Sequence, residues 1–254
     1  PSRLRDAIAR LNPHIPEAAD LADRLKRVIA RRDFIQSAAA GAFILALGGA
    51  RWVLADDDHN AAARKALRAD GRPRLPAGQR IVRKLTPMGG VAGDPKTKTW
   101  RLKVHGDVAR PMELDYAALL KMPQVDQICD VHCVTGWSAL DSSWRGVTLA
   151  TVAQMAGVNA TARYVILEAA GGFTVNLRLA DALASDVLIA HQHTGRPLAR
   201  KNGAPVRVVV PNLYFWKSAK WLTGIRFSTR DEAGYWEKRG YHNRGDPWKE
   251  ERYA

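Results

Sequence analysis

The stretch of sequence on which the interpretation of this chain depends is residues 129–138, which reads CDVHCVTGWS. It lies in a run from Val125 to Thr135 that we expect to form a strand, and it carries both cysteines of the chain, Cys129 and Cys133. Side chains four apart on a strand point to the same face, so a local disulfide would need a turn between them. We expect one cysteine with a chemical role and one packed as a small hydrophobic residue.

Three kinds of chemistry are compatible with cysteine, histidine and aspartate this close together. Zinc sites use four ligands at recognised spacings, and the second half of such a set is missing here. On a strand, His132 would also point away from both cysteines. A nucleophilic thiolate would need a base and an orienting partner. A single thiolate can also bind a metal that already carries other sulfur ligands. The local sequence therefore leaves all three possibilities open: a zinc site, a nucleophilic thiolate and a thiolate bound to a metal that carries other sulfur ligands.

A second distinctive stretch follows about 70 residues later, with NGAPVRVVVP at 202–211 and YFWKSAKW at 214–221. Its Asn202 side chain can both donate and accept hydrogen bonds at the edge of a heterocycle. Its cations suit a phosphate-bearing cofactor, because guanidinium and ammonium groups bind phosphate oxygens. These cations are Arg207, Lys217 and Lys220. The alternative is a solvated basic loop between two core strands.

The N-terminal part, residues 1–55, has the order of a twin-arginine export signal. Arg31 and Arg32 precede an uncharged Ala- and Gly-rich run at 37–50, and cleavage would follow Ala55. That run is shorter than the roughly 20 apolar residues of a spanning helix. We expect a helical extension that serves as a signal. An uncleaved anchor and a buried helix of the fold are the alternatives.

The rest of the chain divides into a charged linker at 56–80 and a domain at 81–254. Short strands and short helices alternate irregularly there, which favours an α+β fold with mixed sheets over a regular parallel doubly wound sheet. Expected strands lie at 99–105, 125–135, 163–169, 173–177, 206–210 and 221–228. Expected helices lie at 114–120, 149–156 and 179–183.

The composition suggests partners that carry negative charge. The chain has 254 residues and a net charge of +14, which attracts an acidic redox partner, an anionic substrate or a phosphate-bearing cofactor. We find no zinc-finger spacing and no regular mixing of basic and aromatic residues, so we expect no nucleic-acid binding. Among the eight tryptophans and their aromatic neighbours, Trp137, Tyr214 and Trp216 are candidates for the wall of a cleft, with core packing as the alternative.

Taken together, the motifs resemble those of a known family. These motifs are HCVTGWS at 132–138, NGAPVRVVVP, YFWKSAKW, and GYWEKRGYHNRGDPWKEERY at 234–253. They resemble the bacterial sulfite-oxidase-like molybdopterin-dependent oxidoreductases, over roughly residues 76–254. A more distant similarity is to the catalytic subunit of the periplasmic methionine sulfoxide reductase, which also carries a twin-arginine signal.

The resemblance implies a fold, a cofactor and a set of site residues. The fold is the mixed-sheet molybdopterin-binding fold of sulfite oxidase, and the cofactor is Mo-molybdopterin. Cys133 takes the role of catalytic residue and protein ligand to molybdenum. His132 beside it is expected to contact the cofactor or to support its ligand. The other cofactor-binding residues are Asn202, Arg207, Ser218, Ala219 and Lys220.

The resemblance also implies a two-electron oxygen-atom transfer at molybdenum. Sulfite oxidases proper carry paired arginines shortly after the cysteine, and Trp137 and Ser138 lie near those positions here. We therefore expect reduction of an S-oxide or N-oxide. The alternatives are oxidation of sulfite and an electron-relay subunit without turnover of its own. No C-x-x-C-H haem motif is present, so electrons would come from a separate protein, such as a membrane haem subunit or a cytochrome. The export signal implies a periplasmic or membrane-anchored enzyme facing the periplasm.

Overall fold

The computed structural model describes residues 61–254. The expected signal or anchor at 1–55 and the first residues of the expected linker lie outside this range. Residues 61–65 are helical. Two further residues of the expected linker, Leu75 and Gln79, are buried, at 2% and 1% exposure. The part of the linker that the structure describes therefore packs into the domain.

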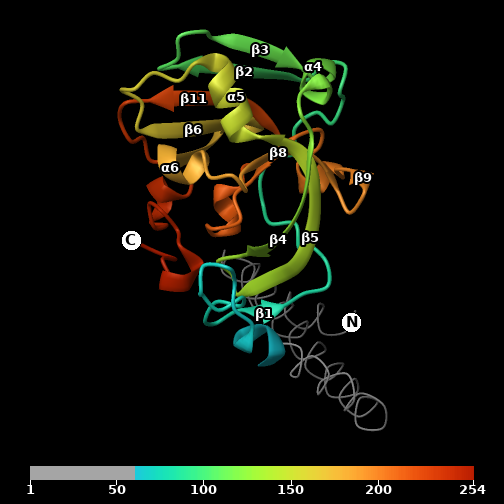
Figure 1. The fold of residues 1–254 in the computed structure, drawn as a ribbon, viewed down its shortest axis with the longest axis vertical. Helices are drawn as coiled ribbons and strands as arrows, with labels where there is room; N and C mark the ends of the chain where they lie inside the picture. Colours follow the sequence, from blue (N-terminus) through green and yellow to red (C-terminus); the bar gives the residue numbers. More distant parts are fainter. Residues whose placement is uncertain (1–60) are drawn as a thin grey trace, which may run out of the picture. The chain divides into compact units, whose positions relative to one another are not determined.

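Two mixed sheets form the domain. The five-stranded sheet has the order β3-β2-β11-β6-β7, and β2 and β11 are its parallel pair. Figure 1 shows β2, β11 and β6 side by side. The strands are β2 (Arg101–Gly106), β3 (Met112–Asp115), β6 (Tyr164–Ala169), β7 (Phe173–Arg178) and β11 (Leu222–Ser228).

The six-stranded sheet has the order β1-β5-β8-β10, with β4 paired to β5 and β9 paired to β8. Only β1 and β5 run parallel in it. The strands are β1 (Arg80–Ile81), β4 (Val125–His132), β5 (Trp137–Thr148), β8 (Leu188–His193), β9 (Arg196–Pro197) and β10 (Arg207–Val209). Sheets of this kind with few helices confirm the expected α+β class.

The helices are short and have clear ends. Asp115 caps α4 (Tyr116–Lys121) by accepting from the Ala118 amide, and Thr148 caps α5 (Leu149–Ala156) by accepting from the Thr151 amide. Gly157 ends α5 in the left-handed conformation, with φ +64°. The remaining helical turns are α6 (Leu179–Ala182), η1 (Ala170–Gly172), η2 (Arg200–Asn202), η3 (Phe215–Lys217), η4 (Glu237–Arg239) and η5 (Pro247–Lys249).

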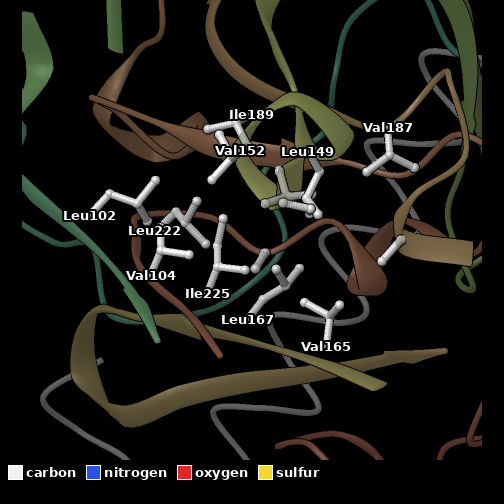
Figure 2. Packing of buried hydrophobic residues seen from close by; sticks show 14 of the residues in the cluster. Leu102, Val104, Leu149, Val152, Val165, Leu167, Val187, Ile189, Leu222 and Ile225 are labelled. Carbon is white, nitrogen blue, oxygen red and sulfur yellow. The ribbon is translucent and has the colours of Figure 1, made fainter. Parts of the chain in front are cut away.

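The main core lies between the five-stranded sheet, α5 and one face of the six-stranded sheet. Figure 2 shows side chains of β2, β6 and β11 pointing toward α5 and β8. The labelled residues are Leu102, Val104, Leu149, Val152, Val165, Leu167, Val187, Ile189, Leu222 and Ile225. All are 2% exposed or less, so this cluster supplies most of the hydrophobic stabilisation.

Strand β10 separates this core from a second one. Successive side chains of a strand point to opposite faces. Val208 accordingly belongs to the main core, whereas Val209 belongs to a second cluster on the other face of the sheet. Arg207 precedes Val208, so it shares the face of Val209. The second cluster also contains Cys133, Trp137 and Trp144. The alternation therefore places Arg207 and Cys133 on the same side of the six-stranded sheet.

The structure differs from the sequence expectations at several points. The strand expected at 125–135 ends at His132, and Cys133 begins a hydrogen-bonded turn that Gly136 closes in the left-handed conformation. Residues 114–120 were expected to form one helix, but the chain forms β3 up to Asp115 and only then α4, because the Asp115 side chain caps the helix there. The sequence also predicts no strand at 137–148, yet β5 is the longest strand and pairs with β1, β4 and β8.

Two adjacent leucines of α4 test the position of the main core. Leu119 is fully buried and Leu120 is 42% exposed. Leu119→Ala is expected to lower the free energy of unfolding by about 2–5 kcal/mol, because it removes buried methyl groups and leaves a cavity. Leu120→Ala makes the same change in helix propensity and is expected to cost less than about 0.5 kcal/mol. Urea denaturation of both variants measures the difference. Equal losses would contradict the packing described here.

Candidate functional site

Cys133 lies at the start of the tight turn that joins β4 to β5. Its amide donates to the Trp137 carbonyl at 2.8 Å, and its own carbonyl accepts from the Gly136 amide at 3.0 Å. Gly136 has φ +87°, a conformation that side-chain-bearing residues rarely adopt. The turn therefore fixes the Cys133 backbone from both ends.

A buried polar network holds the same turn from behind. Gln79 Nε2 donates to the Cys133 carbonyl at 3.0 Å, and Gln79 Oε1 accepts from the Ser138 hydroxyl at 3.2 Å. The Ser138 hydroxyl also lies 2.8 Å from His132 Nδ1. Gln79, Ser138 and His132 are all 1% exposed or less. Arg252 donates to the next carbonyl, that of Val134. The C-terminal tail and the segment before β1 thus converge on the cysteine turn.

His132 is on the opposite face of the strand from Cys133. Its ring packs edge-to-face on Trp248, with centroids 5.1 Å apart. Burial lowers the pKa of His132 to about 4, so the ring is neutral at pH 7. The Ser138 hydroxyl donates its hydrogen bond to Gln79, so it accepts a hydrogen bond from His132 Nδ1. Among residues 61–254, His132 Nε2 has no hydrogen-bond partner. The structure places His132 behind the Cys133 turn.

The Cys133 side chain is buried in the second cluster and its Sγ lies 3.2 Å from the Thr135 hydroxyl. Tyr241 of the C-terminal tail packs against this cluster. Both cysteines are free thiols in the structure. Burial raises the pKa of the Cys129 thiol to about 12, so this side chain stays protonated. In the described part of the chain no three His, Cys, Asp or Glu residues gather as a metal site.

Arg207 is the buried cation of the second cluster. It is 2% exposed and donates only to backbone carbonyls, those of Asn202 at 3.0 Å, Ser218 at 2.8 Å and Val208 at 3.3 Å. Within residues 61–254 no carboxylate pairs with it. Burial lowers the pKa of Arg207 to about 9. A guanidinium has five N–H donors, so some remain for a further acceptor, and an anion would offset the cost of burying this charge.

The residues expected to bind phosphate gather around Arg207. Gly203, with φ +107°, sits so close to Arg207 and Lys220 that an added Cβ would lie 3.1 Å from the Cβ of each. The Ser218 hydroxyl accepts from the Val210 amide at 2.9 Å, and the Ala219 carbonyl accepts from the Val208 amide. The turn at 218–220 is therefore hydrogen-bonded along β10.

Lys220 contributes a second cation to this group. Its Nζ donates to the carbonyls of Met88 and Gly89 at 2.8 and 2.7 Å, and no ion pair with an acid is found in the part of the chain that the structure describes. Burial and the nearby Arg207 lower the pKa of Lys220 to about 8. Two neighbouring cations without a carboxylate form a cradle that suits an anion.

The expectation that Lys217 joins this cradle is wrong. Its side chain is fully buried, pairs with Glu237 at 2.6 Å and donates to the Asn176 side chain and to two backbone carbonyls. Lys217 therefore ties the C-terminal tail to β7 through Asn176.

Aromatic side chains connect the cradle to the cysteine turn. Phe215 lies under the Arg207 guanidinium, 4.3 Å from carbon to ring centroid, and its centroid is 6.1 Å from that of Trp137. Trp144 is the other ring beside Arg207, at 5.5 Å. Of the expected wall residues, Trp137 and Tyr214 belong to the second cluster, and Trp216 stacks on Tyr214. The indole N–H groups of Trp137 and Trp144 are buried without a partner among the described residues.

Sequence reasoning missed Gln79, Thr135, Trp144 and Phe215. Gln79 stands in a charged segment that gives no signal of burial, and Trp144 lies in the strand that the sequence does not predict. Thr135 belongs to the cysteine motif, but the sequence does not show that the turn brings its hydroxyl close to the Cys133 sulfur.

A family comparison agrees with this geometry. Residues 89–236 match the family model described as oxidoreductase molybdopterin binding domain. The chain belongs to this family. It is a molybdopterin-binding oxidoreductase, as the motifs predict. No helix within residues 61–254 has both the length and the apolar character needed to span a membrane.

Individual relatives point the same way. The chain is 44% identical over 192 residues to the uncharacterized oxidoreductase YuiH of Bacillus subtilis, covering 75% of this chain and 97% of that protein. It is 32% identical to the protein-methionine-sulfoxide reductase catalytic subunit MsrP of Burkholderia mallei, covering 57% of this chain and 48% of that one. It is 28% identical to the putative protein-methionine-sulfoxide reductase subunit YedZ1 of Azospira oryzae, over 61% of each chain. The chain spans less than two thirds of these last two relatives.

A solved structure confirms the fold. The sulfane dehydrogenase SoxCD of Paracoccus pantotrophus matches with a TM-score of 0.53 at 18% identity, covering 62% of this chain and 46% of that one. At this identity the match shows the fold alone.

The donors on this face fit a molybdopterin. A pyranopterin with a phosphate offers polar ring edges and an anion. Considering residues 61–254 alone, the face offers two indole N–H groups without a partner, a buried guanidinium without a carboxylate and a lysine beside it. Cys133 adds a soft sulfur donor. By contrast, a cavity of about 600 Å³ beside Cys129 holds arginines that already pair with aspartates, so it is not an equivalent anion site.

The Lys217–Glu237 pair gives a prediction separate from cofactor binding. Lys217→Met is expected to lower the free energy of unfolding by about 3–5 kcal/mol, because it leaves the Glu237 carboxylate buried without its charge partner. Lys217→Met combined with Glu237→Leu is expected to cost less than the two single changes added together. Denaturation of the single and double variants measures the coupling. Simple additivity would show that the pair is not coupled.

Proposed function

We propose that this molybdopterin oxidoreductase reduces an S-oxide or N-oxide by two-electron oxygen-atom transfer, with the Cys133 thiolate as the protein ligand to molybdenum. One observation carries the proposal: Cys133 and the uncompensated Arg207 lie on the same face of the six-stranded sheet, connected through Phe215 and Trp137. A soft ligand at one end and a cation at the other match a cofactor with a metal at one end and a phosphate at the other.

Each of the expected site residues has a role under this proposal. Arg207 and Lys220 bind the phosphate end, and the Ser218 hydroxyl, which accepts from Val210, still has a proton to donate to it. The Ala219 backbone keeps the turn against β10. Asn202 contributes its side-chain amide to a polar edge. His132 acts through Ser138 and Gln79 on the Cys133 backbone.

The cofactor, when bound, supplies the redox chemistry of the oxygen transfer. The protein binds it, orients it and surrounds it with the aromatic side chains of the second cluster. Reducing one sulfoxide to a sulfide consumes two electrons and two protons and releases one water. The protein must therefore receive electrons from another molecule.

The residues after Cys133 support reduction as the direction of the proposed reaction. Where sulfite oxidases carry paired arginines, Trp137 is 3% exposed and the Ser138 side chain is hydrogen-bonded to Gln79. Neither provides a cation for an oxyanion such as sulfite. A neutral S-oxide or N-oxide needs no such cation. The names of two relatives, both methionine sulfoxide reductase subunits, support the same direction.

Partner and location are part of the proposal. Those two relatives are named as subunits, which favours a separate electron donor here, such as a membrane haem subunit or a cytochrome. The positive net charge would attract an acidic donor. The twin arginines at 31–32 favour export to the periplasm or anchoring on its side of the membrane.

Metal analysis tests the cofactor site. Protein from cells that make the cofactor is expected to contain stoichiometric molybdenum, and protein from cells that cannot make it is expected to contain none. Arg207→Gln is expected to lose most of the metal, since it removes the charge that binds the phosphate. Arg101→Gln, a half-exposed arginine of β2, is the matched control and is expected to keep it. Wild-type protein without molybdenum would refute the proposal.

Activity assays test the reaction. The assay uses a reduced dye as electron donor and offers methionine sulfoxide, dimethyl sulfoxide and trimethylamine N-oxide as substrates. At least one of the three is expected to be reduced with a kcat/KM well above that for sulfite oxidation. Cys133→Ser is expected to lower kcat by about 100-fold or more, because even the loss of a residue that supports a metal ligand costs up to about 100-fold. Faster sulfite oxidation would favour the sulfite oxidase alternative. Loaded protein that exchanges electrons but turns over none of these substrates would favour the relay subunit.

A further inference from the structure

The hydroxyl of Thr135 lies within hydrogen-bond distance of the Cys133 sulfur. Tyr241, which also packs against this cluster, makes no hydrogen bond to the sulfur among residues 61–254. Thr135 Oγ1 lies 3.2 Å from Cys133 Sγ, and either atom can be the donor in the free thiol. Among residues 61–254 the Thr135 hydroxyl has no other hydrogen-bond partner. The contact joins two residues of one tight turn, since Thr135 follows Cys133 by two positions.

The turn is too constrained for this contact to be a passing one. Four hydrogen bonds hold the residues on both sides of Thr135: Cys133 to Trp137, Gly136 to Cys133, Gln79 to the Cys133 carbonyl, and Arg252 to the Val134 carbonyl. Thr135 itself is exposed and lies between Val134 and Gly136. The Cys133 backbone and the Thr135 backbone are therefore fixed relative to each other. Thr135 is also β-branched, so its χ1 angle has few accessible values.

Binding of a metal decides which atom donates. A metal-bound cysteine is a thiolate and has no proton, so it can only accept. The Thr135 hydroxyl must then donate to sulfur. Hydrogen bonds to metal-bound sulfur withdraw electron density from it and change the reduction potential of the metal.

We propose that Thr135 is a positioning residue that donates a hydrogen bond to the Cys133 thiolate and thereby raises the reduction potential of the bound metal. The bond makes sulfur a weaker donor, which favours the reduced, more electron-rich metal. The inference rests on the proposed role of Cys133 as the metal ligand. It adds Thr135 as the residue that adjusts how strongly the Cys133 sulfur donates electrons to the metal.

The test compares Thr135→Val with Thr135→Ser in the cofactor-loaded protein. Valine keeps the branched shape and removes the hydroxyl, whereas serine keeps the hydroxyl. Thr135→Val is expected to keep its molybdenum and to shift the equilibrium between oxidised and reduced metal about threefold to tenfold toward the oxidised form. A tenfold shift lowers a one-electron potential by about 59 mV. Thr135→Ser is expected to restore the wild-type value.

Absorption gives a second readout. The sulfur-to-molybdenum charge-transfer band is expected to move to longer wavelength in Thr135→Val, because the thiolate becomes richer in electrons, and to return in Thr135→Ser. Thr97→Val removes an exposed hydroxyl outside the hairpin and is expected to change neither readout. If Thr135→Val loses its metal, Thr135→Ala provides a second side chain without a hydroxyl, and the same two shifts are expected.

The outcomes separate the two proposals. If the potential and the band of Thr135→Val equal those of the wild type while the metal is retained, the role of Thr135 is refuted and the role of Cys133 stands. If Cys133→Ser keeps the wild-type charge-transfer band, the ligand assignment is refuted and the role of Thr135 fails with it. Matching shifts in the variants without a hydroxyl, reversed in Thr135→Ser, establish the hydrogen bond.

Discussion

The buried guanidinium of Arg207, which has no carboxylate beside it among residues 61–254, is the interaction on which the rest of the site depends. Removing such a charge from water costs several kcal/mol. Three backbone carbonyls and the face of Phe215 recover only part of that cost, because carbonyls are dipoles and not ions. The fold tolerates the remainder because β10 is pinned by the apolar side chains that alternate with Arg207. An anionic group beside Arg207 would offset the remaining cost of burying its charge.

The opposite end of the same face is built for rigidity. Cys133 lies in a turn held by Gly136, Gln79 and Arg252, and these come from three separate parts of the sequence. A ligand on a loose loop would bind metal only after losing conformational entropy. Here folding has already fixed the turn. Behind it, the neutral His132 keeps the Ser138 hydroxyl directed at Gln79, so a residue that faces away from the sulfur still governs its backbone.

The parts of this arrangement that sequence could predict are those carried by local pattern. The strands at Arg101–Gly106, Tyr164–Ala169 and Leu222–Ser228 follow from apolar periodicity, and the family follows from motifs around Cys133 and Arg207. Strand β5 could not be predicted, because its Ser, Asp, Arg and Gly residues hide the alternation, and its pairing with three other strands is what stabilises it. Lys217 and Gln79 show the same limit. The charge of Lys217 suggests a phosphate ligand, and the charged residues around Gln79 suggest a linker. Only tertiary contacts reveal the ion pair of Lys217 and the buried amide of Gln79.

The residues after Cys133 connect the scaffold to the choice of substrate. In this chain Ser138 is fully buried and serves the network behind the cysteine, and Trp137 packs against Phe215, which in turn lies under Arg207. Replacing either by arginine would place a second unpaired charge in a cluster that already contains one, and it would break a contact that holds the turn. The residues next to Cys133 therefore hold the turn and pack the cluster. The cations of this face, Arg207 and Lys220, lie together at its other end beside Gly203. Under the proposed function, such a division would suit the Cys133 end to a neutral oxide and the Arg207 end to phosphate.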